Sequence, residues 1–143
     1  MQAACGLAQL EKLEKFICIR KSNFRYLRDL LDDLSDFIIL PTQTPNSEPS
    51  WFGFPITLKE NIKFSRTELL NFLESKKIGT RLLFGGNLLK QPYFEGRKYR
   101  VSGSLNNTNK IMNDTFWVGV YPGLTNEHLD YISSNLHNFF LKK

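Results

Sequence analysis

The residues best suited to hold a ligand lie in one short stretch of the chain. Arg81, Asn87, Lys90, Gln91 and Tyr93 place a guanidinium, two amides, an ammonium and a phenol within thirteen positions. These groups donate hydrogen bonds to phosphate and hydroxyl oxygens, and ligands of open α/β sheets often bind beyond strand ends. Because a strand is predicted just before this stretch, we predict a ligand site here. A solvated surface is the alternative.

The glycines in this stretch do not form a recognised phosphate-binding motif. Gly85-Gly86-Asn87 follows the predicted strand, but neither the GxGxxG spacing of dinucleotide-binding loops nor the GxxxxGK[ST] spacing of P-loops is present. The pattern alone is weak evidence for a phosphate cradle.

The other reactive residues predict no catalytic or metal site. His128 and His137 are nine positions apart on a predicted helix, which is not the i, i+4 spacing of a helical metal pair, and we expect no Ser or Cys nucleophile beside either. Both are predicted to be structural or exposed. Cys5 and Cys18 belong to no CxxC motif or Cys/His cluster, so they are predicted to be small buried apolar residues.

Acidic residues cluster near the end of the first predicted helix. Asp29, Asp32, Asp33 and Asp36 are three and four positions apart and share one helical face. Carboxylates can bind a cation, but no further ligands are placed to complete a coordination shell. A solvated helical face is the expected interpretation.

The positive charge is concentrated in the middle third of the chain. The net charge is +5, with −1 in residues 1–50, +6 in residues 51–100 and 0 in residues 101–143. A basic block raises the local concentration of an anionic partner such as a nucleotide, a phosphorylated metabolite or a nucleic acid. Nucleic-acid binding would also need exposed aromatic residues among the cations, for which residues 93–99 offer the candidates. A solvated face is again the alternative.

The apolar pattern predicts the elements that position these residues. Leu and Ile spacings predict one long helix over residues 2–35 that ends before Pro41. A capping box, Ser65 to Glu68, predicts a helix of about eleven residues, with Gly79 available for a left-handed cap. The other predicted elements are strands at 51–57, 80–84 and 116–121, an irregular stretch at 87–109, and a last helix after Thr125 with the apolar stripe Leu129, Ile132, Leu136 and Phe139 or Phe140.

Together these elements predict an α/β fold, a two-layer sandwich of a small three-stranded sheet and helices, preceded by one long helix. The predicted organisation is a long connecting helix at residues 1–40, a linker at 41–50 and a small α/β domain at 51–143. Pro55 predicts that the first strand lies at an edge or ends there.

The composition bounds the class of protein. A hydrophobic content of 41% is enough for a core, and no apolar run approaches the roughly 20 residues of a membrane span. The first residues lack the basic and apolar regions of a signal peptide, so a cytoplasmic location is expected.

Several segments together resemble a known enzyme family. They are residues 1–10, 64–66, 77–88, 91–92 and 111–124. Over nearly the whole chain they are similar to the C-terminal third of the CDP-4-dehydro-6-deoxyglucose 3-dehydrases. These enzymes belong to the DegT/DnrJ/EryC/StrS sugar-aminotransferase family of pyridoxal-phosphate fold-type-I enzymes.

The resemblance implies a role in making 3,6-dideoxyhexoses for the O-antigen of lipopolysaccharide. In that family pyridoxamine phosphate condenses with the 4-keto sugar, a histidine in place of the usual Schiff-base lysine removes a proton, and the 3-hydroxyl leaves. A reductase then delivers electrons through a two-iron two-sulfur cluster. The histidine, the cluster cysteines and most contacts to pyridoxal or pyridoxamine phosphate lie in a large domain upstream of the region of similarity. We therefore expect neither cofactor to be bound by this chain alone.

The resemblance implies that this chain corresponds to the small domain that closes over the active site in the family. It implies Arg81, Asn87 and Gln91 as contacts to the CDP-sugar, and it implies no catalytic, cofactor-binding or metal residue here. The first helix starts without a capping residue and with small side chains from Ala3 to Ala8, so we expect it to pack against the large domain and the chain to be a truncated one.

The expected partners are the CDP-sugar, the large pyridoxal-phosphate domain or a homodimer partner, and the reductase, with no nucleic acid and no membrane. Several alternatives stay open. The chain could be a complementing or binding subunit for a separately encoded large domain, part of a nucleotide-sugar aminotransferase, an unrelated basic binding module, or a remnant without function.

Overall fold

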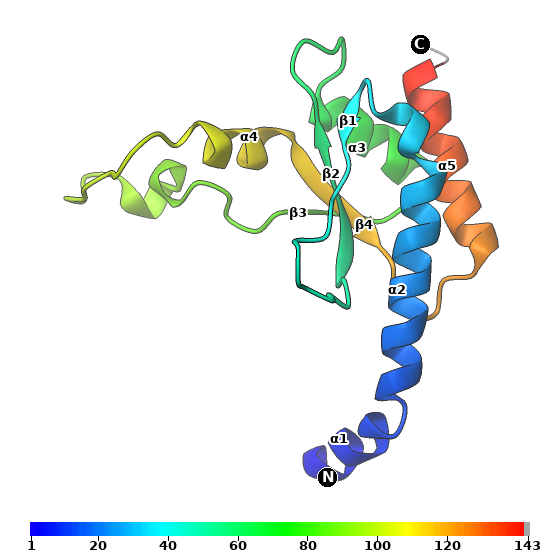
Figure 1. The fold of residues 1–143 in the computed structure, drawn as a ribbon. Coiled ribbons are helices and arrows are strands. Elements are labelled where there is room, and N and C mark those ends of the chain that lie inside the picture. The colour runs from blue at the N-terminus through cyan, green and yellow to red at the C-terminus, as the bar shows by residue number, and fades with distance from the viewer. Residues whose placement is uncertain (142–143) are drawn as a thin grey trace.

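A four-stranded antiparallel sheet with helices on one face forms the centre of the computed structural model, which describes residues 1–141 (Figure 1). The strand order is β1-β2-β4-β3. In chain order the elements are α1 (Gln2–Leu10), α2 (Leu13–Leu30), the 3-10 helix η1 (Asp32–Leu34), β1 (Ile38–Ile39), β2 (Gly53–Leu58), α3 (Arg66–Ser75), β3 (Thr80–Leu82), the 3-10 helices η2 (Leu88–Lys90) and η3 (Pro92–Phe94), α4 (Asn106–Asp114), β4 (Thr115–Gly119) and α5 (Asn126–Leu141). The predicted small α/β fold is confirmed, with β1 as a fourth, two-residue strand.

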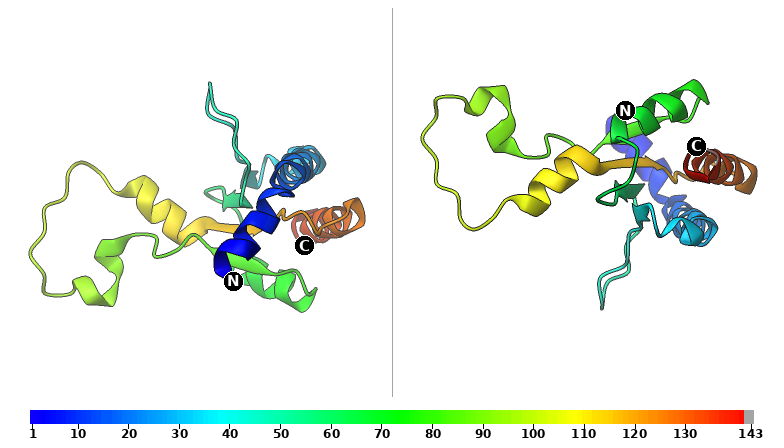
Figure 2. Two further views of the ribbon diagram at one scale, coloured as in Figure 1. Left: turned by 90° about the horizontal axis from the view of Figure 1, so that it is seen from below. Right: turned by 90° about the horizontal axis from the view of Figure 1, so that it is seen from above.

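The two faces of the sheet have different surroundings. In β2 the side chains of Phe54, Ile56 and Leu58 are buried, while the alternate positions are partly exposed. Helices α2, α3 and α5 lie together on the buried side (Figure 2). The apolar stripe predicted for the last helix is buried among them, at Leu129, Ile132, Leu136, Phe139 and Phe140. Within residues 1–141 the opposite face, which carries Pro55 and Trp117, has no helical layer.

The single long N-terminal helix is corrected to two helices. Residues 11 and 12 interrupt it, and the Lys12 N–H bonds back to the Gln9 carbonyl at 3.0 Å in a turn. The apolar spacing continues through this break, so periodicity does not reveal it. No residue of α1 is buried.

The predicted burial of the two cysteines is wrong. Both Cys5 and Cys18 are exposed, because no described element covers α1 or the outer side of α2.

The irregular stretch predicted at residues 87–109 also needs correction, because it contains the 3-10 helices η2 and η3 and the first four residues of helix α4. Residues 83–114, which we call the arm, run out from β3 through η2 and η3 and return through α4 to β4 (Figures 1 and 2). Helix α4 contains four asparagines, which favour turns over helix, and its only apolar residues are Ile111 and Met112. Its sequence therefore gives little helical signal.

The capping box of α3 is confirmed, but its C-terminal cap is not the predicted glycine. The Ser65 hydroxyl accepts from the Glu68 N–H, and the Glu68 carboxylate accepts from the Ser65 N–H. At the other end Lys77, not Gly79, takes the left-handed conformation, with φ of 62°. The Ile78 N–H then bonds to the Leu73 carbonyl at 3.0 Å, as in a Schellman motif.

The predicted edge position of the first strand is wrong, since β2 lies between β1 and β4 and continues past Pro55 to Leu58, but the strand is locally open beside Pro55. Although β2 is inside the strand order, β1 pairs only with Thr57 and Leu58. Pro55 therefore has a strand on one side, where it is opposite Trp117, and its missing N–H costs no ladder bond on the other side.

Candidate functional site

The three predicted ligand contacts lie on β3 and the first part of the arm, but they are not equivalent. Arg81 is exposed on β3. Its Nη1 donates to the Thr80 carbonyl at 2.9 Å, and no other protein partner among the described residues takes its remaining N–H groups. Most of the guanidinium N–H donors of Arg81 are therefore available to a ligand.

Asn87 is used mainly inside the protein. Only 4% of it is exposed. Its Oδ1 accepts from the Leu89 N–H at 3.0 Å, and its Nδ2 donates to Asn109 Oδ1 at 2.9 Å. Asn87 therefore caps η2 and ties the outgoing half of the arm to α4.

Gln91 closes the loop over the glycines that follow β3. Its Nε2 donates to the Gly85 carbonyl at 2.6 Å, and its side chain is half-buried. Lys90 and Tyr93, the other members of the predicted cluster, are exposed further along the arm, where the Arg97 guanidinium lies 5.2 Å from the Tyr93 ring centroid. The structure thus brings Asn87 and Gln91 into one loop and leaves Arg81 on the adjoining strand.

The glycine and aromatic residues before this loop have unusual backbone conformations. Gly86 has φ of 60°, and a Cβ there would lie 2.6 Å from Met112 Cγ, so α4 packs directly on its backbone. Phe84 has φ of 50° and is 88% exposed. Left-handed backbone is rare for bulky residues and is found preferentially at functional sites.

An apolar hollow of about 170 Å³ lies beside the loop on the open face of the sheet. Phe52 lies edge-on to Trp117, with ring centroids 5.2 Å apart. The indole of Trp117 approaches so closely that a Cβ on Gly53 would lie 2.3 Å from its Cε3. The hollow is lined mainly by Trp51, Phe52, Pro55, Leu83, Phe84 and Trp117. Sequence reasoning missed it, because its walls come from three separate segments.

Arg66 holds the junction between the arm and the sheet and was not singled out from the sequence. Its Nη1 donates to the Met112 carbonyl at 2.5 Å and to the Thr115 carbonyl at 3.0 Å. Its buried Nε has no hydrogen-bond partner among the described residues. The sequence could have pointed to Arg66 through the capping box, because Ser65 as the N-cap makes Arg66 the first residue of α3.

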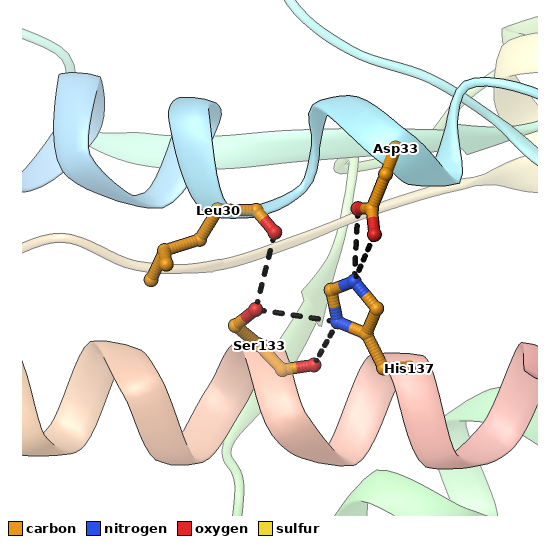
Figure 3. A network of polar contacts seen from close by, with 4 residues as sticks. All are labelled: Leu30, Asp33, Ser133 and His137. Carbon is orange, nitrogen blue, oxygen red and sulfur yellow. Dashed lines mark hydrogen bonds and ion pairs between the residues drawn. The ribbon is translucent and has the colours of Figure 1, made fainter.

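A Ser–His–Asp group joins α5 to the end of α2 and to η1 (Figure 3). His137 Nε2 lies 2.8 Å from Asp33 Oδ1, and Ser133 Oγ lies 3.3 Å from His137 Nδ1. The expectation that no Ser lies beside His137 is therefore wrong, since Ser133 is one helical turn earlier.

This group lacks the geometry of a catalytic triad. His137 Nδ1 lies 2.8 Å from the Ser133 carbonyl, which can only accept, so that nitrogen carries a hydrogen and cannot take one from Ser133. Ser133 is 5% exposed, and its hydroxyl also lies 3.3 Å from the Leu30 carbonyl. The arrangement supports the predicted structural role of His137.

The hollow does not fit pyridoxal phosphate as a complete site. Its lining offers no lysine for a Schiff base and no carboxylate for the pyridine nitrogen. Across residues 1–141 no group of three or more His, Cys, Asp and Glu side chains could hold a metal ion. No helix in this part of the chain is long and apolar enough to cross a bilayer.

Three comparisons place the chain among known proteins. It is 61% identical over 140 residues to lipopolysaccharide biosynthesis protein RfbH of Salmonella typhimurium, covering 98% of this chain and 32% of that protein. It is 47% identical over 142 residues to dTDP-4-dehydro-2,6-dideoxy-D-glucose 3-dehydratase of Saccharopolyspora spinosa, covering 99% and 30%.

A solved structure extends the likeness to the fold. The E. coli GDP-4-keto-6-deoxy-D-mannose-3-dehydratase with bound hydrated PLP superposes with a TM-score of 0.82 at 29% identity, over 92% of this chain and 33% of that one. The chain thus spans about a third of the length of the relatives it matches.

The match to a family model covers almost all of the described residues. The model of the DegT/DnrJ/EryC1/StrS aminotransferase family matches residues 1–137. The match includes β3, the arm and the hollow, so the candidate site lies within the family's shared region. The chain belongs to the DegT/DnrJ/EryC1/StrS aminotransferase family.

Proposed function

We propose that this chain forms the C-terminal portion of a CDP-4-dehydro-6-deoxyglucose 3-dehydrase that depends on pyridoxal or pyridoxamine phosphate, and that it is inactive alone. The observation that carries the proposal is the 61% identity to RfbH, a protein named for lipopolysaccharide biosynthesis, over 98% of this chain. The 47% identity to a sugar-nucleotide 3-dehydratase supports the reaction class. The product would be a 3,6-dideoxyhexose of the O-antigen, made in the cytoplasm.

Within this proposal the chain binds and orients the substrate. The cofactor, when bound by the whole enzyme, supplies the electron sink for loss of the 3-hydroxyl. Arg81 contacts the pyrophosphate, because its exposed guanidinium keeps donors that match phosphate oxygens. The excess of +6 in residues 51–100 draws in the anionic nucleotide.

Asn87 and Gln91 contribute chiefly through the shape of the loop. Their amide groups bond to Asn109 and Gly85, so the loop beyond Arg81 is held in place before a ligand arrives. A preorganised loop lowers the entropy cost of binding. Gln91 Oε1 has no described partner and is the atom we assign to a sugar hydroxyl.

The electron-transfer step is a separate expectation. The resemblance implies a reductase and a two-iron two-sulfur cluster, but the matched relatives' names mention no cluster. Cys5 and Cys18 lie exposed on separate helices and do not provide a cluster site by themselves. We therefore leave the cluster out of the role proposed for this chain.

Reconstitution tests the proposal. The chain is mixed with a polypeptide corresponding to the preceding two thirds of its relatives, together with pyridoxamine phosphate and CDP-4-dehydro-6-deoxyglucose, and the cofactor absorbance is followed. We expect a spectral change only in the complete mixture. A change with the chain alone, or none in a mixture shown by sedimentation to form a complex, would contradict the proposal.

The same assay distinguishes a dehydrase from an aminotransferase. A complementing subunit would also restore activity in the complete mixture, and it would differ by forming a stable complex with a separately encoded large domain. A nucleotide-sugar aminotransferase would instead require an amino-group donor such as glutamate and would release an amino sugar.

A further inference from the structure

We propose that the aromatic hollow on the open face of the sheet binds the flat ring of a nucleotide, with the phosphates of that nucleotide held by Arg81. The hollow is the space of about 170 Å³ beside Phe52, Phe84 and Trp117. The assignment of the ring as the cytosine of a CDP-sugar rests on the proposed function. The preference for an aromatic ring that carries phosphate rests on the geometry alone.

The size and walls of the hollow fit one ring. Pockets that enclose a drug-sized ligand measure about 300 Å³ or more, so about 170 Å³ suits a single ring with the rest of the ligand outside. Aromatic side chains form much of the wall, and base-to-aromatic stacking tolerates any flat base. Gly53 lets the Trp117 indole lie against the strand, since any side chain there would collide with it.

Phe84 is the aromatic residue of the hollow whose exposure and backbone conformation point most clearly to a bound ligand. It is 88% exposed, although burial of a Phe side chain is favourable, and its backbone has φ of 50°. This conformation is unfavourable in free energy for a bulky residue, and residues in such conformations are found preferentially where a protein holds a ligand. A stacked ring would cover the side chain that the strained backbone presents beside the hollow.

The charges around the hollow favour an anion-bearing ligand over an apolar protein surface. Arg81 and Pro55 are the cross-strand partners of Trp117 on either side, so Arg81 shares the face that carries the hollow. On another side the Arg20 guanidinium lies 5.7 Å from the Phe52 ring centroid. No lining residue is acidic. Two guanidinium groups beside an aromatic surface complement a base linked to phosphates.

Titration of the full chain with three probes tests the proposal. Cytidine 5′-diphosphate, cytidine and ribose 5-phosphate are added separately, and saturation-transfer NMR reports contact with the base protons of the two cytidine compounds and with the sugar protons of ribose 5-phosphate. We expect cytidine 5′-diphosphate to bind with a Kd on the order of 1 mM. Phe84→Ala should weaken cytidine 5′-diphosphate and cytidine by about fivefold or more. Arg81→Gln should weaken the diphosphate and leave cytidine unchanged.

Matched controls separate these effects from general damage. Tyr131→Ala removes an exposed aromatic residue of α5, and Arg25→Gln removes an exposed cation of α2. Neither should change any of the three affinities. Phe84→Leu keeps an apolar side chain without the flat ring and should bind cytidine as weakly as Phe84→Ala.

Several outcomes would overturn the proposal. They are no binding of cytidine 5′-diphosphate by the wild-type chain, an unchanged affinity in Phe84→Ala, or a loss of self-association in Phe84→Ala without a change in nucleotide affinity. The last would mean that a second copy of the chain covers the hollow. Turnover in the reconstituted mixture with no effect of Phe84→Ala on nucleotide affinity would keep the proposed function and remove the hollow's role. Nucleotide binding that depends on Phe84, without turnover in the reconstituted mixture, would keep the hollow's role and contradict the proposed function.

Discussion

Met112 packs directly on the backbone of Gly86, so that a Cβ at Gly86 would lie 2.6 Å from the Met112 Cγ. This contact and the Asn87–Asn109 hydrogen bond of 2.9 Å join the two halves of the arm. The loop proposed to meet the substrate is therefore positioned by α4, a helix that contributes no proposed ligand contact itself.

Gly86→Ala is expected to loosen the arm. The left-handed backbone and the collision with Met112 should together cost about 2 to 4 kcal/mol. Hydrogen exchange of the α4 amides measures the loss where it occurs. Gly79→Ala is the control, because a Cβ there meets nothing within 4 Å, and equal exchange in the two variants would contradict the role of the contact.

Asn87→Ala is expected to destabilise the same region by about 1 to 3 kcal/mol. The substitution removes partners from the Leu89 N–H and from the Asn109 Oδ1 in a part-buried setting. A double-mutant cycle with Asn109→Ala, followed by chemical denaturation, measures the coupling. Additive effects would show that the two amides do not act as a pair.

Lys77→Gly is expected to stabilise the protein by about 1 kcal/mol. Lys77 has φ of 62°, which glycine adopts without the steric cost that other residues pay. Thermal or urea unfolding measures the change. Lys76→Gly is the comparison variant: its φ is −91°, so glycine there adds freedom to the unfolded chain, and the substitution also removes the Lys76 ammonium that lies 5.6 Å from the Phe72 ring centroid. Both effects should lower the stability.

Asp33→Asn and His137→Ala should show a small coupling, within about 1 kcal/mol. The contact between His137 Nε2 and Asp33 Oδ1 is 2.8 Å long, but the Asp33 side chain is 66% exposed, and exposed polar pairs contribute little. Unfolding of the single and double variants gives the coupling free energy. Asp36→Asn serves as the control at a nearby exposed carboxylate. A coupling well above this range would mean that the contact between η1 and α5 is stronger than its exposure indicates.

Tyr26 is expected to make the stability fall at alkaline pH. Its hydroxyl donates to Asp130 Oδ1 at 2.8 Å, and this bond to the carboxylate raises the pKa of Tyr26 above its ordinary value. The contribution is fully present below the pKa of the unfolded tyrosine, near 10, and is lost as the pH rises through the higher folded value. The difference in unfolding free energy between wild type and Tyr26→Phe should therefore shrink above about pH 10. A difference in unfolding free energy that stays constant with pH would contradict the link between Tyr26 ionisation and stability.

The sequence predicted the parts of the fold that depend on local signals. The Ser65–Glu68 capping box and the apolar stripe of α5 are specified by neighbouring residues, and both are confirmed. The two-residue strand β1 was missed because it depends on pairing with Thr57 and Leu58, which local propensity does not encode.

The sequence predicted where the candidate site residues lie in the fold better than it predicted the contacts that their side chains make. Arg81, Asn87 and Gln91 do fall on one strand and its loop, as their spacing suggested. The burial of Asn87 could not be predicted, because its partner Asn109 is 22 positions away on a helix with little sequence signal. The hollow at Trp117 depends likewise on the register that places Pro55 and Arg81 on either side of it.

The most direct test of the central claim is the mass of the sugar nucleotide after incubation with the chain, the preceding two thirds of the enzyme and pyridoxamine phosphate. Without a reductase, we expect the CDP-4-dehydro-6-deoxyglucose to lose its 3-hydroxyl only in the complete mixture, and Arg81→Gln to slow that loss at low substrate concentration. Loss of the hydroxyl with the chain omitted, or an amino sugar as the product, would contradict the account.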